Sequence, residues 1–159
     1  MNATVHAQKQ TDNSALLEMA DKLYKNLKMG TDAITSLLPK VTGKSEKIRS
    51  DMTAQLEGYE SMAKRVRAIL NDASVTPKEE KLMVKMSSKI GMAMNTMIDA
   101  SPSHIAEMMI EGSTMAITDT IKLKHQYEHS ADGESEVMKI ADELISFEQN
   151  NIEKMKEYL

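Results

Sequence analysis

Apolar residues recur at every third or fourth position along most of this chain, and short polar stretches interrupt the pattern. This spacing places apolar side chains on one face of an α-helix. It predicts five helices, at about residues 14–38, 44–72, 77–99, 102–129 and 134–157. Runs of β-branched or aromatic residues, which strands favour, are few. The sequence therefore predicts an all-α protein.

Proline and capping residues mark several of the predicted helix ends. Pro39 ends the first segment because proline cannot donate a hydrogen bond to the preceding turn. The stretch TPKE at residues 76–79 combines an N-cap threonine, a proline at the first helical position and a glutamate that can close a capping box. Ser101 and Pro102 repeat this start signal, and Gly133 lies in the last break.

The breaks are short, so each helix is expected to reverse the direction of the one before it. We expect residues 14–159 to form a single domain, an up-down four-helix bundle with the helix at 77–99 as an additional crossover. With that crossover the second and fourth helices run parallel, which is the chain path of a ferritin-like bundle. Residues 1–13 are expected to form a mobile polar tail.

Composition narrows the function classes. The 159 residues include no Cys and carry a formal net charge of -4, with no basic run of the kind that binds nucleic acid. The absence of Cys excludes thiolate chemistry and fits a reducing cytoplasm. The first residues lack the apolar core of a signal peptide, and no segment reaches the ~18 apolar residues of a membrane span. We therefore expect a cytoplasmic protein that binds neither nucleic acid nor membranes.

Four stretches carry a resemblance to a known group of proteins. They are NLKMGTDAITSLLPKV, AQLEGYESMAKR, SPSHIAEMMIEGSTMAITD and FEQNNIEKMKEYL. In this order they resemble uncharacterised small ferritin-like four-helix-bundle proteins of Gram-positive bacteria (Firmicutes), over about residues 15 to 159. The resemblance implies a ferritin-like fold, a bacterial cytoplasmic setting and a homo-oligomer such as a dimer. It implies no reaction.

Ferritin-like di-iron proteins use a Glu on each of two helices and a Glu-x-x-His motif on each of the other two. Glu148 points into the predicted core, but Asn151 stands where the histidine of such a motif would be. The second helix offers Gln55 in place of a glutamate and Gly58 in place of a histidine. One inward carboxylate is too few for two hard cations. We therefore predict no metal site and no cofactor, with iron as the alternative.

A carboxylate in a core needs hydrogen-bonding partners. The inward polar residues near Glu148 are Asn151, Gln55, Tyr59 and Thr31. We predict that these five residues form a polar layer that fixes the register of the helices, as a buried Asn does in a coiled coil.

Methionines dominate the inner stripe of the helix predicted at 77–99, where Met83, Met86, Met94 and Met97 recur at helical spacing among the 15 methionines of the chain. Methionine fills irregular gaps in cores and also lines adaptable binding surfaces. These residues therefore pack into the core or form an interface or a groove.

Three hypotheses for function remain. The first is a non-enzymatic bundle that self-associates and acts as a structural or interaction protein. The second is a di-iron-type oxidoreductase or iron-binding protein. The third is a binding module that takes an apolar ligand or a peptide helix in the methionine-rich groove, and a large apolar cavity beside the helix at 77–99 would favour it.

Overall fold

The computed structural model describes residues 2–41, 45–77, 100–129 and 135–159. These contain four long helices and two short 3-10 turns, and no strand occurs among them. The helices are α1 (Asn2–Leu37), α2 (Glu46–Asp72), α4 (Pro102–Tyr127) and α5 (Glu136–Met155); the 3-10 turns are η1 (Leu38–Lys40) and η3 (Lys156–Tyr158). The prediction of an all-α chain is confirmed. The helix predicted at 77–99, with its four methionines, lies outside the described residues except for Pro77.

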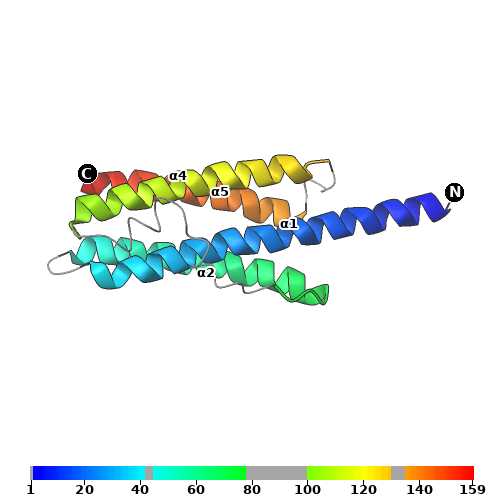
Figure 1. The fold of residues 1–159 in the computed structure, drawn as a ribbon, viewed down its shortest axis with the longest axis horizontal. Coiled ribbons are helices and arrows are strands. Elements are labelled where there is room, and N and C mark those ends of the chain that lie inside the picture. Colours follow the sequence, from blue (N-terminus) through cyan, green and yellow to red (C-terminus); the bar gives the residue numbers. More distant parts are fainter. Residues whose placement is uncertain (1, 42–44, 78–99, 130–134) are drawn as a thin grey trace.

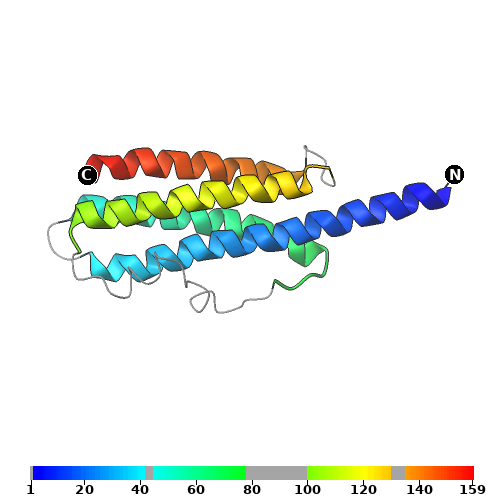
Figure 2. The same cartoon turned by 45° about the horizontal axis from the view of Figure 1, so that its top comes forward.

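The start of α1 differs from the prediction. The helix begins at Asn2, twelve residues before the expected start at residue 14, so residues 2–13 continue it as regular helix. This segment has no apolar stripe, but it also has no Gly or Pro to interrupt a helix. Once a helix has formed, each further residue adds one hydrogen bond at low cost. Figures 1 and 2 show that this end of α1 extends past the ends of the other helices.

The four helices lie side by side around a shared core (Figures 1 and 2). α1 packs against α2 and α4, and α5 completes the bundle by packing against α4 and α2. α2 ends at the end of the bundle opposite the start of α4, so these two helices run in the same direction (Figure 1). With 27 residues, α2 is about 40 Å long.

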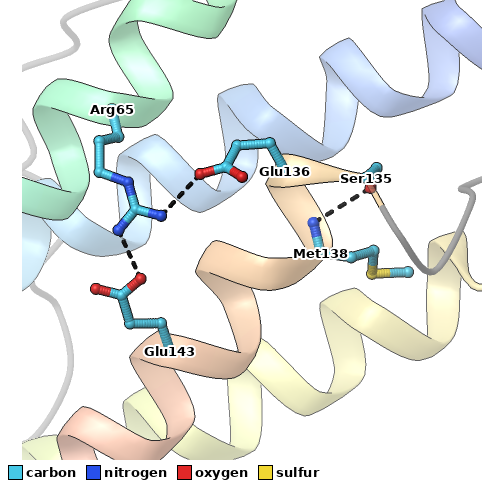
Figure 3. Close-up of polar contacts among 5 residues, drawn as sticks. All are labelled: Arg65, Ser135, Glu136, Met138 and Glu143. Carbon is cyan, nitrogen blue, oxygen red and sulfur yellow. Dashed lines mark hydrogen bonds and ion pairs between the residues drawn. The ribbon is translucent and has the colours of Figure 1, made fainter.

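Serine N-caps begin α4 and α5. The Ser101 hydroxyl accepts a hydrogen bond from the backbone N–H of His104 at 3.3 Å, and Pro102 follows as predicted. At α5 the Ser135 hydroxyl accepts from the backbone N–H of Met138, also at 3.3 Å (Figure 3). Each cap satisfies one of the N–H groups that the first turn of a helix leaves without a partner.

The end of α2 is a Schellman motif. The Val75 N–H donates to the Leu70 carbonyl at 2.8 Å, and the Ser74 N–H donates to the Asn71 carbonyl at 2.9 Å. Ser74 has a φ of 57°, a left-handed conformation in which glycine is usual.

Surface charges join neighbouring helices. Arg65 on α2 reaches across to two carboxylates of α5, Glu136 at 2.8 Å and Glu143 at 2.5 Å (Figure 3). Because these side chains are 40–55% exposed, each ion pair contributes at most about 1 kcal/mol. None of the described helices is long and apolar enough to cross a membrane.

Candidate functional site

Glu148 lies in the middle of α5 and is completely buried. The Tyr59 hydroxyl on α2 donates a hydrogen bond to its Oε1 atom, and Asn151 Nδ2 donates to its Oε2 atom at 3.5 Å. Ser113 on α4 supplies a third side-chain hydrogen bond to the carboxyl group. Three helices therefore meet at this one buried acid.

The other two residues predicted for the polar layer are buried as well, but no hydrogen bond joins either of them to Glu148 among the described residues. Thr31 donates to the backbone carbonyl of Leu27 at 3.1 Å, one helical turn before it. Gln55 is 5% exposed, and its Nε2 atom has no hydrogen-bond partner in the part of the chain that the structure describes. The observed network around Glu148 thus contains Tyr59 and Asn151 and does not extend to Thr31 or Gln55.

Ser113 was not among the residues predicted for the polar layer. It lies four residues after Met109, and this spacing placed it beside the inner stripe of α4, where it could have been recognised. From the sequence alone, a serine in that position is interpreted as a small core residue. Its role depends on which side chain of α5 faces it.

Burial and hydrogen bonding act in opposite directions on Glu148. Removal from water raises the pKa of its carboxyl group, while hydrogen bonds from Tyr59, Ser113 and Asn151 lower it, and the net pKa is higher than the ordinary value of 4.5. Burial, together with the neighbouring Glu148, also raises the pKa of Tyr59 well above 10. Tyr59 therefore keeps its proton and acts as a donor.

Close packing fixes the ring of Tyr59. A Cβ atom added at Gly30 of α1 would lie 2.5 Å from Cε1 of this ring, so only glycine lets α1 approach it. Phe147 on α5 contacts the ring edge-to-face, with 5.2 Å between centroids and 80° between planes. Gly58 in turn makes room for Phe147. The two glycines thus hold the donor to Glu148 in place.

A cavity of about 120 Å³ lies beside this network. Its lining includes exposed residues of α1 and α4, among them Met29, Met115 and Asp119, and it reaches inward to the buried Gln55 and Glu148. The walls are almost entirely apolar, and the helix faces that form them carry the small residues Gly30, Ala33, Gly112 and Ala116. The groove predicted from Met83, Met86, Met94 and Met97 lies outside the described residues, whereas this cavity has its own methionines, Met29, Met108, Met109 and Met115.

The described residues do not form a di-iron donor set. They contain no group of three or more His, Cys, Asp or Glu side chains that could hold a metal ion. Glu148 has Tyr59, Ser113 and Asn151 as partners rather than a second carboxylate. These neighbours are hydroxyl and amide groups that donate to the acid, and they do not suit two hard cations that need several anionic oxygens.

Comparison with known proteins finds no protein-family model, no curated protein and no solved structure that matches the chain.

Proposed function

We propose that this protein is a non-enzymatic helical bundle that binds a small molecule in the cavity between α1 and α4. The observation that carries the proposal is the cavity itself, about 120 Å³ in volume, with walls that are mostly apolar. Its few polar lining residues are Asn26, Gln55, Tyr59, Ser113, Asp119 and Glu148. Small-molecule sites in proteins typically combine an apolar lining with a few polar groups, and helical bundles commonly hold them between helices.

The apolar walls of the cavity support this function. The cavity opens to solvent beside the exposed residues Met29, Met115 and Asp119, so its apolar side chains face water when no ligand is bound. A ligand that covers these side chains removes apolar surface from water, which is favourable by about 25 cal/mol per Å².

Methionine methyl groups provide a direct assay. With ¹³C-methyl methionine incorporated, small neutral compounds of about five to seven heavy atoms are added, the size taken up by an apolar cavity of similar volume. We expect saturable chemical-shift changes at the four lining methionines, Met29, Met108, Met109 and Met115, and little change at distant ones.

A blocked variant tests the location. Ala116→Phe places a ring in the cavity wall and should abolish the shift changes. The control is Ala54→Phe, the same substitution at an exposed alanine of α2, which should bind like the wild type. Binding that persists in Ala116→Phe, or no binding by any compound, contradicts the proposal.

We propose further that the bundle is ferritin-like and that the chain is related to the small ferritin-like proteins of Gram-positive bacteria. The parallel course of α2 and α4 supports the first of these (Figure 1), and the four stretches quoted above support the second. In this proposal the hydrogen-bonded Glu148 occupies the level at which ferritin-like enzymes hold iron. The donor set around Glu148 favours a structural acid over the alternative of a di-iron oxidoreductase.

A cytoplasmic location and self-association as a homodimer remain predictions. Exposed methionines at the cavity mouth, Met29 at 39% and Met115 at 40%, give the α1–α4 face an apolar rim that suits either ligand entry or a partner. Sedimentation of the purified chain over a range of concentrations tests self-association independently of ligand binding.

A further inference from the structure

Gln55, a residue at the inner end of the cavity, has a buried hydrogen-bond donor without a partner among the described residues. Gln55 lines the cavity, is 5% exposed, and its Nε2 atom makes no hydrogen bond within the described ranges. Buried amide groups nearly always have partners, because leaving one unsatisfied sacrifices its interaction with water. The Nε2 atom itself has almost no accessible surface, so a ligand in the cavity reaches this donor when the side-chain amide of Gln55 rotates toward the cavity that the residue lines.

The carboxyl group of Glu148 is less available to a ligand than the amide of Gln55. Glu148 already accepts hydrogen bonds from Tyr59, Ser113 and Asn151, so its oxygens are largely satisfied by the protein. Gln55 is therefore the polar group of this cavity best placed to recognise a ligand.

The charge of the lining residues excludes anionic ligands. The cavity is lined by Glu148 inside and by the exposed Asp119 at its mouth, and no Lys, Arg or His is among its described lining residues. An anion would lose its hydration there without gaining a positive partner. A neutral molecule avoids that cost.

We infer that the ligand is a small neutral molecule with a compact apolar body and one strong hydrogen-bond acceptor, such as a ketone or amide carbonyl, whose oxygen accepts from Gln55 Nε2. This inference rests on the proposed function, because it assigns the chemistry of the ligand to the same cavity. The apolar walls hold the body of the molecule, and the amide orients its acceptor.

A pair of isosteric probes separates the contribution of the apolar walls to affinity from that of the hydrogen bond to Gln55. Cyclopentanone carries a carbonyl oxygen where methylenecyclopentane carries a CH2 group, so the two differ in the acceptor alone. Both are titrated into the wild type and Gln55→Met, with the methionine methyl shifts as readout. Methionine is similar in length to glutamine and is a good helix former, so the variant removes the donor and keeps most of the packing.

We expect the wild type to bind cyclopentanone about five- to tenfold more tightly than methylenecyclopentane, the ratio that one buried hydrogen bond provides. In Gln55→Met this preference should disappear, mainly through weaker binding of the ketone. Cyclopentanecarboxylate should not bind either protein.

The outcomes distinguish the inference from the proposed function. If neither neutral probe binds the wild type, the cavity is not a binding site and both fail. If both bind with equal affinity and Gln55→Met changes neither, the site stands and the inference is overturned. Tighter binding of cyclopentylammonium than of the ketone also overturns it, because the carboxylate of Glu148 would then be the recognition group. The wild-type preference needs no variant, so it remains a test even if Gln55→Met fails to fold.

Discussion

Replacing Tyr59 with phenylalanine removes one hydroxyl group from the polar layer and leaves the ring. The ring keeps its edge-to-face contact with Phe147 and its close approach to Gly30. What is lost is the hydrogen bond to the buried carboxyl group of Glu148. A hydrogen bond to a charged group contributes about 1.5–3 kcal/mol, against about 0.5–1.5 kcal/mol for a neutral pair. The cost of Tyr59→Phe should therefore depend on whether Glu148 is ionised.

The sign of this pH dependence follows from the direction of the pKa shift. The pKa of Glu148 in the folded protein is above its ordinary value of 4.5, and the hydrogen bond from Tyr59 holds it lower than burial alone would. Because the folded pKa is raised, the favourable contribution of protonated Glu148 is fully present below 4.5 and is lost as pH rises through the folded pKa. Tyr59→Phe raises that folded pKa further. The destabilisation should thus be smallest below about pH 4.5 and should grow through the folded pKa toward neutral pH.

Urea unfolding monitored by circular dichroism at acidic and at slightly alkaline pH measures this difference. We expect a loss of about 1 kcal/mol at the lower pH and about 2–3 kcal/mol at the higher one. In a Glu148→Gln background the cost should become independent of pH and remain near the neutral value. Tyr24→Phe, at another buried tyrosine, provides the control. A cost that is the same at both pH values, or unchanged by Glu148→Gln, would refute the reasoning.

Three further substitutions test the local structure, each by the midpoint of urea or thermal unfolding. Gly30→Ala should destabilise by about 1–3 kcal/mol, because the new Cβ collides with the ring of Tyr59 and this outweighs the roughly 1 kcal/mol gain in helix propensity; a stabilised variant contradicts the close packing. Ser135→Ala should cost about 1 kcal/mol, since the N–H of Met138 loses its capping oxygen, and no change would mean that the cap does not form. Ser74→Gly should stabilise by about 0.5–1 kcal/mol by relieving the left-handed conformation, and a loss of stability would contradict that backbone geometry.

Periodicity and capping residues were sufficient to predict α2, α4 and α5 to within a few residues. Each carries a continuous apolar stripe, and two of them begin at a serine that caps the first turn. The first turns of α1 were not predicted because a stripe marks only residues that pack against something. Residues 2–13 lack one, and their helix extends past the ends of its neighbours (Figure 1).

The residues of the polar layer were predicted more accurately than the hydrogen bonds between them. Helical spacing indicated correctly that Gln55, Tyr59 and Glu148 lie inside, because burial depends on the face of one helix. Hydrogen bonds depend in addition on the height and rotation of the facing helix. For that reason Thr31 was expected to reach Glu148 but bonds to its own helix, whereas Ser113 was overlooked.

The cavity could not be predicted from the sequence. Gly30 and Ala33 on α1 and Gly112 and Ala116 on α4 read separately as small residues on helix faces. Small residues can bring two helices closer together or leave space between them, and the outcome depends on the longer side chains around them. Here α1 and α4 leave about 120 Å³ between those faces.

Gln55 and Glu148, both at the inner end of the cavity, use their hydrogen-bonding groups differently. Substitutions at Glu148 should therefore affect the stability of the fold, and substitutions at Gln55 should affect ligand binding. Glu148 has three side-chain partners within the bundle, so changes at the acid or its donors act on the folded state and on its dependence on pH. Gln55 has an amide nitrogen with no partner in the described chain, so the bundle gains little from that donor as it stands. We infer that a ligand in the cavity that Gln55 lines supplies the missing acceptor.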